Sequence, residues 1–257
     1  MEILVPHEKR GFPEAAVFDF DGTLSKLRAG WESVMGPLMC GLIPGEKEEV
    51  EALVTRYIDD STGIQTIFQM RWLAEEITRR GGHAEDAWVY KDEYNRRLMV
   101  EVGRRREAVA AGGEPADKYR VAGGLEFLAA LKERGVRLYA ASGTDEDDVR
   151  AEAKALGFDV YFEEISGAGR GTDRCSKEAV LRKLVKPGSR LLVVGDGKVE
   201  IALGREAGAL TLGLASNDIP GCDLPDLNMQ KYNRLRAAGA HALTADFTER
   251  EELLSWI

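Results

Sequence analysis

The sequence predicts an α/β fold in which a doubly wound parallel sheet carries a smaller, all-helical domain inserted after the first strand. From about residue 120 onward, helical patterns alternate with short apolar runs, which is typical of parallel sheets with right-handed crossovers. Residues 24–119, in contrast, show helical patterning and no convincing strand. We therefore expect a core domain formed by residues 1–24 and 120–257, with a helical domain over 25–119 between its two parts.

The first predicted strand covers residues 15–19, after a lead-in at 1–14 that contains two prolines. Its apolar run is long enough for a buried strand and too short for a helix. The inserted segment has apolar residues at helical spacing over Glu46–Ile58, Ile64–Arg79 and Ala84–Ala111. Gly103 is a candidate break in the last of these helices, and Gly112–Pro115 ends it.

Beyond residue 119, helices and strands are expected to alternate. The expected helices are Gly124–Arg134, Glu146–Leu156, Lys177–Leu184, Glu200–Ala207, Asn228–Ala238 and Glu249–Ile257. The expected strands are Val136–Ala141, Phe158–Phe162, Arg190–Val194, Leu210–Leu214 and Ala242–Thr244, with a loop at 216–226. In such sheets ligands bind beyond the carboxyl ends of the strands, so the residues that follow each strand are the candidate functional residues.

The composition indicates a soluble protein that binds neither nucleic acid nor membrane. Lysine and arginine total 35 against 44 acidic residues, and the net charge of −9 disfavours nonspecific nucleic-acid binding. The 3 cysteines are widely spaced, which argues against a disulfide framework or a zinc site and fits a reducing compartment. Neither a signal-type apolar core nor a run of about 18 apolar residues occurs, so we expect a cytoplasmic protein. The sequence does not indicate an oligomeric state.

Two carboxylates, Asp19 and Asp21, end the first predicted strand and are followed by Gly22. Residues two apart in an extended strand point to the same side, so both carboxylates are expected to face one small volume. Two acids at the end of a buried strand are costly unless a cation or hydrogen bonds compensate them, so the pattern indicates a metal site or a catalytic pair. The alternative, an Asp-Gly hairpin turn, is disfavoured because helical patterning follows rather than a second strand.

Polar residues also follow two later strands. Ser142 and Gly143 offer a hydroxyl and a backbone N–H just before a helix, which makes an anion site, although such a loop is equally typical of a helix cap. Asp196 lies between two glycines, as a divalent-cation ligand does, and a turn residue is the alternative interpretation. Lys177 lies at the start of a helix, where its charge opposes the helix dipole; taken alone, it is more simply a surface lysine.

Taken in order, these residues resemble the motifs of the haloacid dehalogenase (HAD) superfamily. Asp19-Phe20-Asp21-Gly22-Thr23 resembles its first motif, DxDGT. The other three motifs are matched by Ser142, by Lys177, and by Asp196 with Glu200. Many members have aspartate where this chain has Glu200, so the role of Glu200 stays open. The inserted helices resemble the C1 cap of phosphatase-type members, and the chain looks phosphoglycolate phosphatase-like.

The resemblance implies a Mg²⁺-dependent phosphatase that forms an aspartyl-phosphate intermediate. Asp19 would be the nucleophile. Asp21 would protonate the leaving oxygen and then act as the base toward the attacking water. Mg²⁺ would be bound by Asp19, the Asp21 backbone carbonyl and Asp196, because hard cations prefer oxygen ligands.

The resemblance also implies how the phosphate is held. Ser142, the Gly143 N–H and Lys177 would neutralise its equatorial oxygens, which is the charge stabilisation that phosphoryl transfer requires. The implied substrate is a small phosphorylated metabolite, such as a sugar phosphate or a phosphoglycolate-like compound. The cap would set specificity by closing over the site and excluding water. Candidates for contact with the leaving group are Arg28, Trp31, Glu32, Thr62 and Gln65, although a packed tryptophan with solvated polar neighbours is an equal interpretation.

Three alternatives stay open at this point. A haloacid dehalogenase of the same fold needs the first aspartate but neither the second nor a metal, so Asp21 argues against it. A phosphomutase differs in the acceptor of the phosphoryl group, which the sequence does not reveal. A noncatalytic HAD-like binding module is disfavoured because all the reactive positions are present, although fold alone does not give function.

Overall fold

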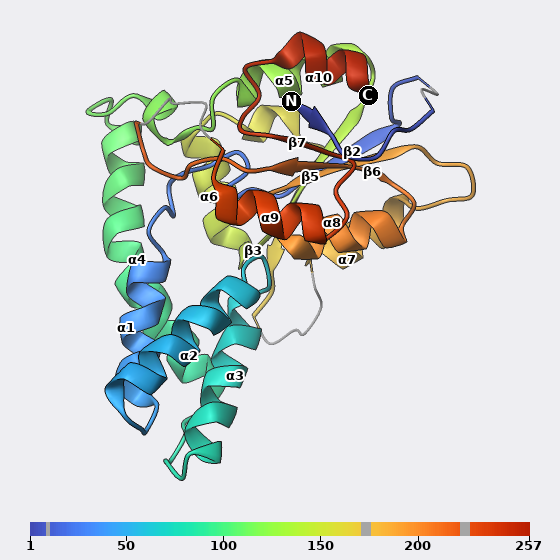
Figure 1. Ribbon diagram of the computed structural model, residues 1–257. Helices are drawn as coiled ribbons and strands as arrows, with labels where there is room; N and C mark the ends of the chain where they lie inside the picture. The colour runs from blue at the N-terminus through green and yellow to red at the C-terminus, as the bar shows by residue number, and fades with distance from the viewer. Residues whose placement is uncertain (9–10, 171–175, 222–226) are drawn as a thin grey trace.

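A seven-stranded sheet with helices on both faces forms the core, and a group of helices extends from one end of it (Figure 1). The computed structural model describes residues 1–8, 11–170, 176–221 and 227–257. The strand order is β1-β7-β6-β5-β2-β3-β4, in which β1 pairs antiparallel with β7 and the other neighbours pair in parallel. The predicted α/β fold with a helical insertion is therefore confirmed.

The strands are β1 (Glu2–Ile3), β2 (Ala15–Phe18), β3 (Arg137–Asp145), β4 (Glu164–Ala168), β5 (Leu191–Gly195), β6 (Leu210–Leu214) and β7 (Ala242–Thr244). The inserted helices are α1 (Glu32–Leu42), α2 (Lys47–Asp60), α3 (Thr66–Arg79) and α4 (Ala87–Ala110). The later helices are α5 (Gly124–Glu133), α6 (Glu146–Ala155), α7 (Ser176–Leu184), α8 (Lys198–Glu206), α9 (Met229–Ala237) and α10 (Arg250–Trp256). Two short 3₁₀ turns, Ala116–Tyr119 and Asp159–Tyr161, complete the description.

Alternation along β2 explains the layers of the core. Ala16 and Phe18 face the apolar side chains of α5, α6 and α10, whereas Ala15 and Val17 face those of α7 and α8. All four are buried, as expected for a central strand of a parallel sheet that is covered on both faces. On either side of β2 the chain order of the strands reverses, and this switch point is where ligands bind in open α/β sheets.

The inserted helices pack against one another and share the core's apolar cluster. Helix α1 packs on α2 and α4, and α3 packs on α4. Buried Met35, Leu73 and Leu98 belong to the same cluster as Phe18 of the sheet. Helix α4 is continuous through Gly103, so the predicted candidate break there is wrong; Leu98 and Val102 keep that part of the helix packed. The domain boundaries themselves stay a prediction.

Most predicted core elements are confirmed with small shifts at their ends, but one strand is wrong. Asp159–Tyr161 form a 3₁₀ turn, which buried Phe158 precedes, and the strand follows at Glu164–Ala168. This strand lies at the edge of the sheet and carries polar residues, so its hydrophobic signal is weak. The sequence also gave no sign of β1, which is only 2 residues long. Of the predicted loop at 216–226, residues 222–226 lie outside the described residues.

No helix in the described part of the chain is long and apolar enough to cross a membrane.

His241 joins three strands at one edge of the sheet. Its backbone N–H donates to the Thr211 carbonyl at 3.0 Å, and its carbonyl accepts from the Leu4 N–H at 2.8 Å. Its ring Nδ1 accepts a hydrogen bond from the Thr211 N–H at 3.1 Å, which a protonated Nδ1 is unable to do. Partial burial, together with the nearby Arg205 guanidinium, lowers the pKa of His241 to about 4.

The shift predicts a pH dependence of stability. The unfolded chain binds a proton at His241 below the ordinary pKa of 6.5, whereas the folded protein does not until about pH 4, so the unfolding free energy falls as the pH drops through this window. We expect a contribution of about 1 kcal/mol, because solvent screens a partly exposed group. Urea denaturation at neutral and mildly acidic pH should show a smaller loss for His241→Gln than for the parent protein. Equal losses would contradict this assignment.

Candidate active site

The structure brings all the predicted site residues to one cavity at the carboxyl ends of β2, β3 and β5. This cavity has a volume of about 110 Å³. Its lining includes Asp19, Asp21, Ser142, Gly143, Lys177 and Asp196. Asp19 follows β2 directly, and its N–H donates to the Val194 carbonyl of the neighbouring β5 at 2.9 Å, which fixes where the strand ends.

Asp19 is buried beside Lys177, which forms ion pairs with Asp19 and with Glu200. The Lys177 ammonium is 3.1 Å from Asp19 Oδ2 and 2.8 Å from Glu200 Oε2. Burial raises the pKa of Asp19 well above its ordinary value, and although Lys177 opposes this shift, the nearby carboxylates of Glu200, Asp196 and Asp21 add to it. Burial disfavours the charged form of Lys177, but its contacts with Asp19 and Glu200 outweigh burial and raise its pKa.

Glu200 has a structural role that the sequence left open. One of its carboxylate oxygens accepts from the Gly197 N–H at the start of α8, and the other accepts from Lys177. The side chain packs directly over Gly195, where a Cβ would lie 2.2 Å from Glu200 Cγ. Glu200 therefore caps α8 and holds the lysine that faces Asp19.

Asp21 is oriented by hydroxyl groups from β3. Ser142 Oγ donates to Asp21 Oδ2 at 3.0 Å, and Thr144 Oγ1 donates to the same oxygen at 2.8 Å. The other oxygen, Oδ1, accepts no hydrogen bond from the described residues and lies 3.7 Å from Arg28 Nε. The side chain of Asp21 is 25% exposed and lines the cavity, so it is available to a ligand there.

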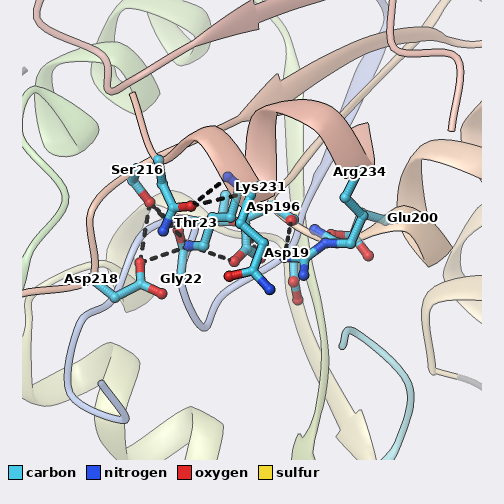
Figure 2. A network of polar contacts seen from close by, with 12 residues as sticks. Asp19, Gly22, Thr23, Asp196, Glu200, Ser216, Asp218, Lys231 and Arg234 are labelled. Atoms are coloured by element: carbon cyan, nitrogen blue, oxygen red, sulfur yellow. Dashed lines mark hydrogen bonds and ion pairs between the residues drawn. The ribbon is translucent and has the colours of Figure 1, made fainter. Parts of the chain in front are cut away.

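Asp196 is surrounded by contacts from the first motif and from α9, as Figure 2 shows. Its Oδ2 is 2.8 Å from the Lys231 ammonium, and its Oδ1 is 3.4 Å from the Thr23 hydroxyl. Gly22, with φ of +75°, is required here because a Cβ would lie 2.2 Å from Asp196 Oδ2. Burial opposes ionisation of Asp196, but the Lys231 charge outweighs it and lowers the pKa.

The donor set fits a hard divalent cation. Carboxylate oxygens of Asp19, Asp196 and Glu200 lie within 4.8 Å of one another, and all three residues are buried. Both carboxylate oxygens of Glu200 are engaged, one by the Gly197 N–H and the other by Lys177. Asp19 and Asp196 each have one oxygen in contact with a lysine, so they are the better pair of candidate cation ligands. Burial, with a smaller contribution from the neighbouring carboxylates, raises the pKa of Asp19 despite Lys177, and a divalent cation would stabilise the charged form of Asp19.

A short loop between α2 and α3 closes over the site. The Gly63 carbonyl accepts from the Lys177 ammonium at 3.2 Å. The Ile64 carbonyl lies where a side chain on Gly143 would project, at 3.1 Å from an ideal Cβ. This close approach explains why glycine stands at position 143 and shows that the inserted helices contribute directly to the cavity.

The cavity is also lined by Arg28, Tyr94 and Leu98. Arg28 Nη2 is 2.6 Å from Glu152 and 3.3 Å from Asp148, so its charge is largely balanced. Burial raises the pKa of Glu152 to about 7 even though Arg28 opposes the shift.

The five residues proposed for leaving-group contact do not all reach this cavity. Arg28, Trp31 and Thr62 line it, whereas Glu32 lines a neighbouring groove of about 530 Å³ between α1, α2 and α9. Gln65 lines neither space, and Gln69 of α3 lines the cavity instead, because Gln65 precedes the helix while Gln69 lies one turn inside it.

Sequence reasoning missed several residues of the site. They are Thr144, Ser216, Asp218, Lys231 and Arg234. Lys231 carried a usable signal, because it lies in the first turn of α9, where a positive charge opposes the helix dipole just as it does at Lys177. Ser216 and Asp218 follow β6, which pairs in parallel with β5 and so ends at the same edge of the sheet.

The arrangement matches known proteins in sequence and in fold. A family model of haloacid dehalogenase-like hydrolases matches residues 13–208. The chain is 28% identical over 203 residues to a phosphoglycolate phosphatase from Rhodospirillum rubrum. The alignment covers 76% of this chain and 77% of that protein.

Solved structures share the fold over nearly the whole chain. A hydrolase from Pseudomonas syringae has a TM-score of 0.61 at 19% identity, covering 95% of this chain and 99% of its own. A β-phosphoglucomutase from Clostridium difficile has a TM-score of 0.62 at 14% identity, and the match covers 95% of this chain and 97% of that protein. The family match spans most of the chain, so this protein belongs to the haloacid dehalogenase-like hydrolases.

The contacts of Glu200 predict a large effect on stability. Glu200→Ala should lower the unfolding free energy by about 3 kcal/mol. The reason is that the buried Lys177 ammonium and the Gly197 N–H each lose the hydrogen bond that they donate to Glu200. Glu200→Gln should cost less, since its amide oxygen still accepts from Gly197. Chemical denaturation of the two variants tests this order, and an unchanged stability of Glu200→Ala would refute the role.

Proposed function

We propose that this hydrolase is a Mg²⁺-dependent phosphatase that cleaves a small phosphomonoester through an aspartyl-phosphate on Asp19. The observation that carries the proposal is that two carboxylates in different surroundings line one cavity. Asp19 is buried against Lys177, whereas Asp21 is half-buried and oriented by Ser142 and Thr144. Carboxylates in such different surroundings suit different roles, one as nucleophile and one as acid and base.

In the first step, a carboxylate oxygen of Asp19 attacks phosphorus, and the bond from phosphorus to the leaving oxygen breaks. Asp21, in its protonated form, gives its proton to that oxygen. In the second step, Asp21 takes a proton from water as the water oxygen attacks phosphorus. The bond between phosphorus and Asp19 then breaks, which releases inorganic phosphate and restores the Asp19 carboxylate.

Positive charge and hydrogen-bond donors would allow the Asp19 carboxylate and the substrate phosphate, both anions, to approach each other. Lys177, the Ser142 hydroxyl and the Gly143 N–H would hold the phosphate oxygens. Mg²⁺, held by Asp19, the Asp21 backbone carbonyl and Asp196, would supply the further positive charge that the repulsion between phosphate and carboxylate demands. Burial and the nearby acids raise the pKa of Asp19, so its charged form is disfavoured and further positive charge would stabilise it.

The size of the cavity favours a short leaving group. Its volume of about 110 Å³ is well below the roughly 300–1,000 Å³ of pockets that hold drug-sized ligands. Arg28, Tyr94 and Leu98 are among the side chains that line it. The similarity to a phosphoglycolate phosphatase agrees with a leaving group of this size, such as a short hydroxy acid or a small sugar. We also expect a cytoplasmic enzyme that binds neither nucleic acid nor membrane.

The hydroxyl contacts to Asp21 disfavour a dehalogenase, because that chemistry leaves the second carboxylate without a task. A phosphomutase remains an outcome of the test, since it would return the phosphoryl group to a sugar rather than to water.

Phosphate release from short phosphorylated acids, phosphorylated sugars and nucleotides tests the proposal. We expect release from a few related short compounds in the presence of Mg²⁺. Activity should fall by at least about 100-fold with EDTA, a loss of roughly 2.7 kcal/mol of transition-state stabilisation. Asp19→Asn is the matched control and should release no phosphate. Equal release with Mg²⁺ and with EDTA would overturn the metal dependence, and silence with folded protein would favour a mutase or a binding role.

A further inference from the structure

A second lysine reaches the candidate cation site, and the proposed reaction gives it no task. Lys231 of α9 is 6% exposed. Its ammonium lies 2.8 Å from Asp196 Oδ2 and 2.7 Å from Asp218 Oδ1, and it donates to Ser216 Oγ at 3.4 Å (Figure 2). A lysine in the first turn of a helix opposes the helix dipole, so these carboxylates rather than the helix account for its position.

Helix α9 holds Asp196 at two points. Arg234 lies three residues beyond Lys231, on the same face of the helix, and its Nη2 donates to the Asp196 backbone carbonyl at 3.3 Å. The guanidinium also bonds Asp59 at the end of α2, with 3.1 Å between Nη1 and Oδ1. Asp196 is therefore fixed through its backbone by Arg234 and through its side chain by Lys231.

The first motif lies directly against this lysine. An ideal Cβ on Gly22 would be 3.1 Å from Lys231 Nζ and 2.2 Å from Asp196 Oδ2. The Ser216 hydroxyl, which accepts from the lysine, donates to the Gly22 carbonyl at 2.7 Å. The ammonium thus lies among the backbone and side-chain oxygens next to which a cation would bind.

We propose that Lys231 is a positioning residue that acts as a resident counter-ion of Asp196 and weakens the binding of a divalent cation to the site. This inference rests on the proposed function, because it takes Asp19 and Asp196 as cation ligands. Two positive charges that share one buried carboxylate repel each other with little screening by solvent. Asp218 binds the same ammonium from the other side, and so reduces the hold of Lys231 on Asp196.

Calorimetric titration of Mg²⁺ into chelator-treated full-length protein, without substrate, tests the inference. Lys231→Met removes the charge and keeps most of the side-chain length, so the Mg²⁺ Kd should fall by at least about tenfold. Lys231→Arg is the matched control that keeps the charge, and its Kd should stay within about threefold of the parent value. An unchanged or higher Kd for Lys231→Met would overturn the proposal.

A second variant and a second readout guard against a merely structural effect. Asp218→Asn leaves Asp196 as the main partner of Lys231, so its Mg²⁺ Kd should rise, and a fall would contradict the inference. In chelator, Lys231→Met should unfold at a lower temperature than the parent protein, because Asp196 and Asp218 lose their shared cation. A lysine with only a structural role would lower this temperature without tightening Mg²⁺ binding.

Asp196→Asn separates failure of this inference from failure of the proposed function. Suppose that the parent protein binds Mg²⁺, that Asp196→Asn abolishes this binding, and that Lys231→Met leaves it unchanged. The role of Lys231 is then refuted, while the cation site stands. If neither the parent protein nor Lys231→Met binds Mg²⁺, the cation site is refuted and both proposals fall with it.

Discussion

The rest of the site depends on negative charge that the fold concentrates where the central strands end. Asp19 and Asp196 are each buried, Glu200 and Asp21 lie beside them, and parallel pairing of β2 and β5 keeps their positions fixed. Burying carboxylates without compensation is costly, so the surroundings must supply cations and donors. Lys177 and Lys231 supply part of this positive charge. The remaining negative charge would favour a divalent cation, and under the proposed mechanism that cation would allow an anionic phosphate ester to approach.

The inserted helices complete the site rather than merely covering it. Their loop places the Gly63 carbonyl on Lys177 and the Ile64 carbonyl over Gly143, and α4 provides Tyr94 to the lining of the cavity. Ion pairs also join the two parts of the chain. Lys91 of α4, for example, bonds Asp145 with 2.6 Å between Nζ and Oδ2. The candidate catalytic carboxylates thus follow strands of the sheet, while the inserted helices form part of the cavity wall.

Much of the fold and site could be predicted because it depends on local signals. Apolar runs that end in Asp19, Ser142 and Asp196 identified the strand ends, and parallel topology then required those ends to meet. Lys231 and Asp218 could not be placed in this way, because their importance arises only when α9 folds back on β6 and brings them to Asp196. Glu200 likewise needed the structure, since a ligand and a helix cap have the same sequence pattern.

Trapping a phosphoryl group on Asp19 would test the proposed mechanism directly. A preferred substrate is mixed with enzyme and Mg²⁺ and quenched in acid during turnover, and the digested protein is examined by mass spectrometry. The peptide that contains Asp19 should gain the mass of one phosphoryl group, and the same peptide of Asp19→Asn should not. Rapid phosphate release without any such modified peptide, or a modification at another residue, would contradict the mechanism.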